Sequence, residues 1–235
     1  MIEVKNLHKK FGKLTVLDGL DLSINKGGIF AVLGPNGSGK TTLIKCLLGM
    51  VIPQNGDILL DGESVLGQSN YRNKINYMPQ IANFPANLSV VELIEMVKNL
   101  RPKQANESDL IALFGLEPHL KKKLGNLSGG TKQKVNIVLA FMFDSNLIIL
   151  DEPTTGLDPI ALIHLKELIQ KAKSEGKTIL ITTHIMSLVD DIADEIVFLL
   201  DGKIYFKGSV PKLKEQTGEK QLEHAIANLL RMQNV

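Results

Sequence analysis

The chain is poor in cysteine and in aromatic residues. Among its 235 residues there is one Cys, there is no Trp, and 5% are aromatic. One thiol, Cys46, excludes an internal disulfide and fits a reducing compartment, and its apolar neighbours in the sequence indicate a small buried filler. So few aromatic rings argue against a surface that stacks the bases of nucleic acid.

The chain also lacks an excess of either charge and any long apolar run. Its 27 Lys and Arg nearly balance its 25 Asp and Glu, so no basic field indicates a nucleic-acid partner. The most apolar stretches, 135–143 and 147–150, fall short of the roughly 18–20 residues of a membrane span. Met1–Val4 lacks the basic and apolar regions of a signal peptide. We therefore expect a soluble, cytoplasmic chain that needs a second protein for any work at a membrane.

What the chain does have is a regular alternation of apolar strands and helices. The pattern predicts strands at 147–150, 178–183 and 195–200, with helices near 160–174 and 186–193 between them. This alternation is typical of a parallel or mixed sheet in an α/β fold. Further strands, antiparallel near the N-terminus, are expected at 2–7, 16–24, 29–33, 56–60 and 75–78.

The pattern changes over 85–127, where helices and loops replace the strands. Ser89 followed by Glu92 is a capping-box signature for the start of a helix, and 107–114 has the pattern of another helix. We interpret the chain as one domain, with a helical subdomain inserted into an α/β core. The expected boundaries are 1–84 and 128–218 for the core, 85–127 for the subdomain and 219–235 for a C-terminal amphipathic helix.

A glycine-rich loop lies between the strand 29–33 and an apolar helix. Glycine, four residues and then Gly-Lys-Thr is the phosphate-loop pattern, and a strand before it and a helix after it are its normal context. The glycines let successive N–H groups face a phosphate, and the start of the helix favours the anion. Lys40 is expected at the β- and γ-phosphate oxygens, and Thr41 at Mg²⁺. The candidate nucleotide ligands are Gly34, Pro35, Asn36, Gly37, Ser38, Gly39, Lys40, Thr41 and Thr42.

Two carboxylates, Asp151 and Glu152, follow the apolar strand 147–150. In an open α/β sheet the carboxyl ends of the strands border the ligand crevice. Asp151 is the candidate for the Mg²⁺ shell, and Glu152 for the base that orients the attacking water. Alone, the two acids would fit a solvated turn closed by Pro153 equally well, and the phosphate loop favours the catalytic interpretation.

A pair of glycines, Gly129 and Gly130, follows Ser128 ahead of the apolar run 135–143. Ser128 alone is explained as a helix cap, because its hydroxyl can accept hydrogen bonds from N–H groups of the first turn. The two glycines are not, since each weakens a helix start by up to about 1 kcal/mol. Bare backbone at a helix N-terminus suits a phosphate that comes from outside, so these residues are candidates for a further nucleotide contact.

In order and in spacing these motifs resemble those of the ATP-binding cassette family, over nearly the whole chain. The family's signature is matched by 127–131 and its pair of acids by 151–152. The resemblance implies an ATPase in which two copies, or two related cassettes, close over two Mg·ATP, with Ser128, Gly129 and Gly130 facing the nucleotide of the opposite chain. It also implies an adenine-stacking aromatic, a glutamine at Mg²⁺ and the reacting water, an acidic loop residue and a switch histidine, which are Phe11, Gln80, Asp158 and His184.

Two positions depart from the family pattern. Thr131 stands where the family usually has Gln, and Lys134 where it commonly has Arg. Thr131 keeps a hydroxyl but has less reach, and Lys134 lacks the planar fork of arginine. The contacts that the family makes through these two positions are therefore not carried over to this chain.

The resemblance further implies a transporter, in which a separate membrane permease carries the cargo and this chain lies at the inner face of the membrane. The strand end 206–209 resembles that of ATPases that pair with six-helix exporter-type permeases. The segments 77–90 and 92–101 look like the copper-system ATPase of nitrous oxide reductase maturation. Scattered Met and His residues and a single Cys do not form a metal site, so partners would handle such a cargo.

Two other classes of cassette protein are possible alternatives. One is a soluble scaffold ATPase, similar to the cassette protein of iron–sulfur cluster assembly, which has no membrane partner. The other is a DNA- or ribosome-associated cassette protein, which is disfavoured because such proteins usually carry coiled-coil arms or two cassettes in one chain. Co-fractionation with a permease separates a transporter ATPase from the scaffold.

Overall fold

The computed structural model describes residues 1–101 and 103–232, and the chain folds into two compact units. Unit 1 combines Met1–Tyr71 with Leu180–Val235, and unit 2 is Arg72–Ile179. Helices and strands occur in both units, as expected for an α/β chain. Each unit is described by itself.

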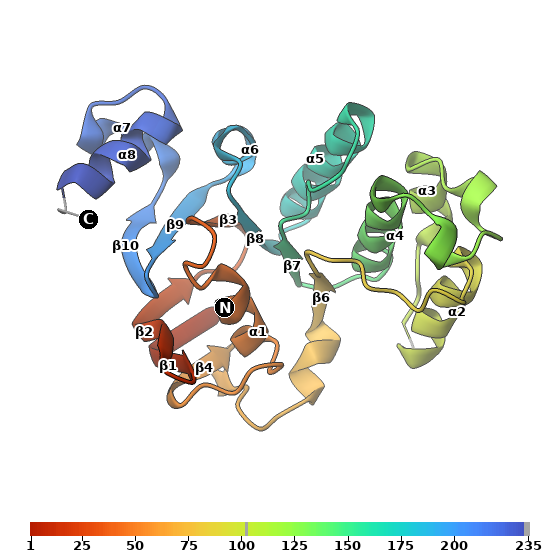
Figure 1. Ribbon diagram of the computed structural model, residues 1–235, viewed down its shortest axis with the longest axis horizontal. Coiled ribbons are helices and arrows are strands. Elements are labelled where there is room, and N and C mark those ends of the chain that lie inside the picture. Colours follow the sequence, from red (N-terminus) through yellow and green to blue (C-terminus); the bar gives the residue numbers. More distant parts are fainter. Residues whose placement is uncertain (102, 233–235) are drawn as a thin grey trace. The chain divides into compact units, whose positions relative to one another are not determined.

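Unit 1 contains an antiparallel sheet of four strands in the order β2-β1-β4-β5 (Figure 1). Strand β1 (Ile2–Phe11) pairs on one side with β2 (Leu14–Ile24) and on the other with β4 (Asn55–Leu60). The short β5 (Glu63–Ser64) pairs with β4. β1 extends beyond the predicted 2–7, because its ladder with β2 continues as far as the hairpin turn.

The other strands of unit 1 belong to a mixed sheet. β3 (Gly28–Leu33) pairs in parallel with β9 (Glu195–Leu200), which pairs antiparallel with β10 (Lys203–Gly208). β8 (Thr178–Thr183) ends in this unit. β8 is buried at every residue, β3 at every residue but its first, and β9 at every residue but its two ends. Burial on both faces explains why these strands are continuous apolar runs in the sequence.

Helix α1 (Lys40–Leu47) begins after the loop that follows β3, as the phosphate-loop pattern predicts. Its apolar side chains Leu43 and Ile44 and the thiol of Cys46 are buried. Burial raises the pKa of the Cys46 thiol to about 11, so the thiol stays protonated at neutral pH. The side chain therefore fills apolar space, as its neighbours in the sequence predicted.

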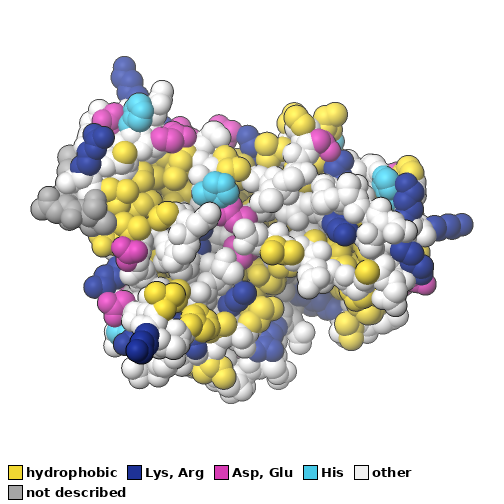
Figure 2. Space-filling view, in the orientation of Figure 1, with side chains coloured by type: hydrophobic (Ala, Val, Ile, Leu, Met, Phe, Trp, Pro, Cys, Tyr) yellow, Lys and Arg dark blue, Asp and Glu magenta, His cyan; other side chains and the backbone are white. Residues whose placement is uncertain are grey.

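Three helices complete unit 1: α6 (Met186–Ile192), α7 (Val210–Thr217) and α8 (Leu222–Met232). The sequence predicted one C-terminal helix over 219–235. In the structure α8 begins later, at Leu222, and residues 233–235 lie outside the described residues. The expectation missed α7, which is capped by Ser209 and buries only a few apolar residues. α7 and α8 lie side by side and pack on an apolar cluster that includes β9 (Figure 1). Figure 2 shows hydrophobic side chains at the surface over this end of the unit.

Among its described residues, unit 2 contains two strands that pair in parallel and four helices. β6 (Ile75–Met78) pairs in parallel with β7 (Leu147–Asp151), which is buried along its whole length. Helix α4 (Gly129–Phe141) precedes β7, and α5 (Pro159–Ser174) follows it. Across the described residues no helix has both the length and the apolar character of a membrane span. Short 3-10 turns lie at Glu117–His119 and Leu124–Asn126, and another, Asn70–Lys74, spans the point in the chain where unit 1 ends and unit 2 begins.

The first helices of unit 2 are α2 (Val90–Leu100) and α3 (Glu107–Leu113). The predicted capping box at the start of α2 is confirmed. The Glu92 N–H donates to Ser89 Oγ (3.4 Å), and the Ser89 N–H donates to Glu92 Oε2 (2.7 Å). The hydrogen bond from the Ser89 backbone is the largest cause that lowers the pKa of Glu92 to about 2. The Glu92 carboxyl therefore stays ionised, and the capping box stays formed, throughout the neutral pH range.

Arg101, the residue that follows α2, ties this helix to the strands of unit 2. Its guanidinium donates to Asn76 Oδ1 on β6 (2.6 Å), to Ser145 Oγ before β7 (3.0 Å) and to the backbone carbonyl of Asn73 (2.7 Å). The guanidinium carbon lies 5.1 Å from the centre of the Phe143 ring. Asn76 and Ser145 are buried, so their polar atoms depend on partners inside the protein.

Replacing Arg101 with Met is expected to lower the free energy of unfolding by about 1.5–3 kcal/mol, because hydrogen bonds to a charged group are lost and buried acceptors lose a donor. Urea denaturation followed by circular dichroism measures the change. Lys103→Met is the matched control, since the exposed Lys103 ammonium also contacts the Asn73 carbonyl (3.0 Å) but no buried side chain in the described chain. This variant should change the free energy of unfolding by no more than about 0.5 kcal/mol. Equal costs for the two variants would contradict the role of Arg101.

Candidate functional site

The glycine loop of unit 1 has a conformation that only glycine tolerates well. Gly34 has a φ of 156° and Gly39 a φ of 107°. A Cβ on Gly34 would lie 2.1 Å from the Leu199 carbonyl oxygen, and one on Gly39 would lie 2.8 Å from the Val16 carbonyl oxygen. The glycine pattern in the sequence therefore corresponds to close backbone packing as well as to unusual dihedral angles.

Lys40 is held inside this loop. Its ammonium donates to the carbonyls of Gly34 (2.7 Å) and Pro35 (3.1 Å), and the residue is only 6% exposed. The hydroxyl oxygen of Ser38 is buried and makes no hydrogen bond within the described residues. A Cβ on Gly37 would meet no described atom within 4 Å. The loop thus combines the oriented ammonium of Lys40, the buried hydroxyl of Ser38 and exposed backbone at Gly37, just before α1. This arrangement suits a phosphate chain.

Two more candidates belong to unit 1. Phe11 ends β1 with 50% of its surface exposed, and the Lys9 ammonium lies 5.0 Å from the centre of its ring. His184 follows β8 and is exposed. The next residue, Ile185, donates its N–H to Thr183 Oγ1 (3.1 Å), which shapes the turn into α6. Both side chains are thus exposed on unit 1.

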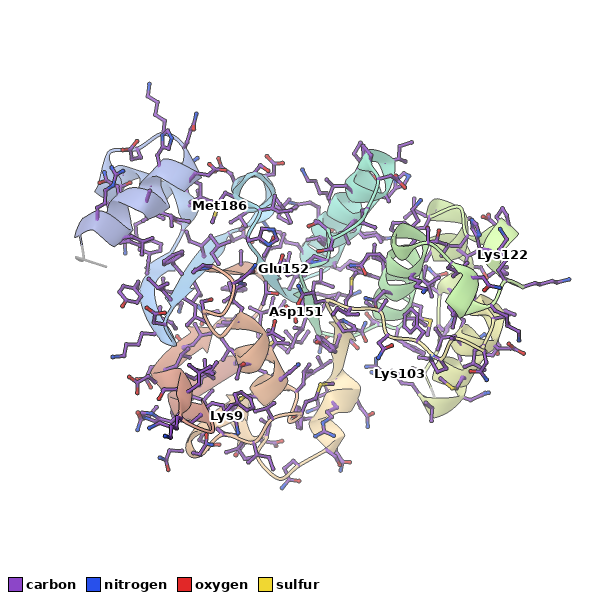
Figure 3. All side chains as sticks on the ribbon, in the orientation of Figure 1. Lys9, Lys103, Lys122, Asp151, Glu152 and Met186 are labelled. Atoms are coloured by element: carbon purple, nitrogen blue, oxygen red, sulfur yellow. The ribbon has the colours of Figure 1, made fainter. Side chains whose placement is uncertain are left out.

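Asp151 and Glu152 stand together at the end of β7 in unit 2, where they are labelled in Figure 3. They are 1% and 4% exposed, so these are not the solvated acids of an ordinary turn. Glu152 has a φ of 48°, a left-handed conformation that costs a residue with a side chain about 1–3 kcal/mol. Burial, and secondly the charge of Asp151, raise the pKa of Tyr77 to about 12. Two buried acids, one of them on a strained backbone, therefore lie side by side at one strand end.

Gln80 follows β6 in the same unit and is exposed. The residue before it is anchored, because the buried amide of Asn136 on α4 donates to the Pro79 carbonyl (2.8 Å). Asn136 was missed from the sequence, where one polar residue in the apolar run 135–143 gives no sign of its partner. It links α4 to the backbone that leads to Gln80.

Ser128 caps α4, as the structural alternative in the sequence suggested. Its Oγ accepts from the Thr131 N–H (3.2 Å) and lies 2.9 Å from Thr131 Oγ1. The two glycines serve different purposes: a Cβ on Gly129 would meet no described atom within 4 Å, whereas one on Gly130 would lie 2.7 Å from the Gly156 carbonyl oxygen. Gly130 is thus required for packing within the unit, and Gly129 leaves the helix start open. Thr131, in place of the usual Gln, engages the serine hydroxyl.

Asp158 and Lys134 form an ion pair in unit 2, with Nζ and Oδ2 2.7 Å apart. The other oxygen of Asp158 accepts from the Ala161 N–H (2.9 Å) and caps α5. The hydrogen bond from Lys134 is the largest cause that lowers the pKa of Asp158. Lys134 therefore supplies a cation to the acidic loop although it lacks the fork of arginine. A contact of Asp158 with nucleotide stays a prediction.

The sequence-predicted site residues divide between the units. The phosphate loop, Phe11 and His184 belong to unit 1, whereas Gln80, the segment 128–130, the two acids and Asp158 belong to unit 2. Chain order alone located the candidates at a strand end or at a helix start. Their hydrogen-bond partners, such as Asn136 for the Gln80 segment, came only from the structure.

Comparison with known proteins identifies the family. Residues 17–155, more than half of the chain, match the sequence profile described as "ABC transporter". The chain belongs to this family. A lantibiotic transport ATP-binding protein, SrtF, of Streptococcus pyogenes is 36% identical over 231 residues, which cover 97% of this chain and 96% of that one. The Nod factor export ATP-binding protein I of Burkholderia orbicola is 34% identical, with 91% and 72% covered.

Solved structures confirm the fold of this ABC ATPase. An ATP-binding subunit of an ABC transporter aligns with a TM-score of 0.90 and 31% identity, over 97% of this chain and 99% of that one. A dimeric ATP-binding cassette in a post-hydrolysis state, bound to ADP and Pi, aligns with a TM-score of 0.79 and 25% identity, over 89% and 98%. The predicted α/β cassette fold, ATP binding and ATPase class are therefore confirmed.

Proposed function

We propose that this ABC ATPase is the motor subunit of an exporter-type transporter, in which two cassettes close over two ATP and a separate membrane permease moves the cargo. The start of α4 carries this proposal. Ser128 and Gly129 are exposed, and the backbone there is open to a ligand, while the chain's own phosphate loop precedes α1. A second helix start that suits phosphate is explained if it binds the nucleotide of another chain. The dimeric relative with ADP and Pi supports such a pair.

Within each cassette the residues have separate roles. Lys40 and the loop N–H groups bind the β- and γ-phosphates, and the Lys40 ammonium neutralises charge on the phosphate oxygens in the transition state. Glu152 accepts a proton from the attacking water, which Gln80 helps to orient. His184 donates to the γ-phosphate. Further proposed nucleotide contacts are Phe11, Gly34, Pro35, Asn36, Gly37, Ser38, Gly39, Thr41, Thr42, Gly130 and Asp158.

The three candidate ligands of Mg²⁺ offer the type of atom that this ion binds. The hydroxyl of Thr41, the amide oxygen of Gln80 and the carboxylate of Asp151 are all hard oxygen ligands, which Mg²⁺ prefers. Asp151 is only 1% exposed, so its carboxylate oxygens are held inside the protein at the end of β7. When bound, Mg²⁺ neutralises charge on the phosphate oxygens. We therefore propose Thr41, Asp151 and Gln80 as its protein ligands.

The names of the relatives favour an exporter. SrtF is named for lantibiotic transport and the Burkholderia protein for Nod factor export. Coupling to copper delivery in nitrous oxide reductase maturation stays a prediction from the sequence, and none of these names supports it. A scaffold ATPase without a membrane partner is the alternative. Affinity purification from membranes in mild detergent tests it, because the transporter proposal requires a polytopic membrane protein to co-purify in a stoichiometric amount.

Replacing Ser128 with Arg tests the two-chain arrangement. If Ser128 faces the nucleotide of the opposite chain, the bulky cation prevents closure, so hydrolysis and ATP-dependent dimerisation are lost while a single chain still binds ATP. If Ser128 only caps α4, the variant should lose about 1 kcal/mol of stability and keep its activity. Size-exclusion chromatography with ATP, a turnover assay and thermal unfolding separate the two. A variant that dimerises and hydrolyses ATP like the parent would remove Ser128 from the interface.

Mixing two inactive variants sharpens this test. In a heterodimer of Ser128→Arg with Lys40→Ala, one composite site combines an intact phosphate loop with an intact signature. Some ATPase activity should then return if one complete site is sufficient for turnover. Ser128→Ala is the matched control, since it removes the cap and the hydroxyl without adding bulk. It should cost stability but still allow ATP-dependent dimerisation.

A further inference from the structure

The Lys9 side chain lies over the ring of Phe11, on the same strand of unit 1. Its ammonium is 5.0 Å from the ring centre, within the roughly 6 Å over which a cation is attracted to an aromatic face. Lys9 is half-buried, and it is labelled beside β1 in Figure 3. Phe11 is 50% exposed. One face of an exposed ring is thus covered by a cation.

The position of this cation is set by a second contact. The Lys9 ammonium donates to the carbonyl of Ile52, at 2.7 Å. The segment that contains Ile52 is tied to β1, because the Gln54 amide accepts from the Lys10 N–H (2.9 Å) and donates to the Lys10 carbonyl (3.0 Å). The Gln54 N–H also donates to the carbonyl of His8 (2.9 Å). The long lysine side chain is therefore oriented by the fold and is not one of many solvated conformers.

An exposed phenylalanine next to a hairpin turn has little to hold its ring. β1 and β2 meet at the pair Phe11 and Leu14, and Leu14 is itself 67% exposed. Ordering such a side chain on ligand binding costs free energy, and a ring that is already oriented avoids that cost. A cation on one face also draws electron density from the ring, which favours stacking of an electron-rich purine on the other face.

We infer that Lys9 is a positioning residue that orients Phe11 to stack on the purine base of the nucleotide. This inference rests on the proposed role of Phe11. Lys9 acts through the ring and not on the phosphates. It therefore affects ligands that carry a base and has no effect on a phosphate chain alone.

The test compares two probes on the purified full-length protein, ATP and inorganic triphosphate, by calorimetry with Mg²⁺. Lys9→Met keeps the length of the side chain and removes the charge. We expect it to weaken ATP binding about two- to fivefold, the range of a cation–ring contact at an exposed site, and to leave triphosphate binding unchanged. The KM for ATP should rise by the same factor with kcat unaltered. Lys9→Arg should restore ATP binding, because guanidinium also stacks on aromatic rings.

Lys10→Met is the matched control, since it removes the same charge from the next, exposed residue of β1. It should change neither probe. Phe11→Ala tests the proposed function itself and should weaken ATP more than Lys9→Met does. In the double variant, loss of the Lys9 charge should add nothing to the loss of the ring, because Lys9 acts through it.

Each outcome has a defined meaning. If Lys9→Met weakens ATP and triphosphate equally, the lysine acts as a general attractor of phosphate and the inference is wrong. If Lys9→Met has no effect or strengthens ATP binding while Phe11→Ala weakens it, the inference also fails but the adenine role of Phe11 survives. If Phe11→Ala leaves ATP binding intact, the proposed base contact itself fails. The inference is supported if Lys9→Met weakens the binding of ATP but not of triphosphate, and if Lys9→Arg restores ATP binding.

Discussion

Replacing Glu152 with Gln is expected to abolish most ATP turnover while ATP binding stays intact. The amide preserves the shape of the side chain and can still form a hydrogen bond, but it cannot accept a proton from water. Loss of a positioned general base lowers the rate by about 10²–10⁴-fold. Because Gln also has a Cβ, it must adopt the same left-handed backbone conformation at φ 48°, so the substitution adds little new strain.

Two measurements check this prediction. Phosphate release at saturating ATP reports turnover, and size-exclusion chromatography with ATP should show a dimer that accumulates because hydrolysis no longer opens it. Glu117→Gln provides the control, since it makes the same chemical change at an exposed residue of unit 2. Near-normal phosphate release by the Glu152 variant would exclude this carboxylate as the base.

Replacing Lys40 with Ala is expected to weaken ATP binding as well as to remove turnover. In the structure the ammonium also donates to the carbonyls of Gly34 and Pro35, so the loop loses an internal contact together with its charge. Hydrogen bonds to a charged group contribute about 1.5–3 kcal/mol, which corresponds to a loss of about 10- to 150-fold in affinity. The charge binds phosphate in the ground state and also neutralises charge that develops in the transition state, so KM should rise and kcat should fall.

Calorimetric titration with ATP measures the affinity of the Lys40 variant. Lys45→Ala on the same helix is the control, because this exposed lysine points away from the buried face of α1 and should bind ATP normally. Thermal unfolding without nucleotide separates loss of loop structure from loss of the phosphate contact. Unchanged ATP affinity in a folded Lys40→Ala protein would contradict the assignment.

The parts that the sequence predicted well are local in the chain. A capping box needs only Ser89 and Glu92, and a phosphate loop needs a strand, a glycine pattern and a helix in immediate succession. Both were located to within a residue or two. Helix α7 was not predicted, because its stability is not local. A helix of this length with few apolar residues is stabilised by the cluster it packs against and not by its own sequence pattern.

The contacts that give several residues their roles are distant in the chain. Lys9 reaches Ile52, Arg101 joins Asn76 to Ser145, and Gly130 packs against the carbonyl of Gly156. No local pattern distinguishes such residues from ordinary surface or core positions. Gly130 is the clearest case. The sequence around it suggested only an exposed helix start, whereas in the structure the Gly156 carbonyl oxygen leaves no room for a Cβ at this position.

The sequence by itself determined the α/β order of elements, the phosphate loop, the acids at the end of a strand and the membership of a nucleotide-binding family. These follow because backbone geometry over a few consecutive residues is set by their own side chains. Only the tertiary structure decided that Asp151 and Glu152 are buried, that Thr131 engages Ser128, that Lys134 pairs with Asp158 and that a cation lies on the ring of Phe11. Burial and side-chain pairing depend on which distant segments the folded chain brings together, and single-residue patterns carry no information about that.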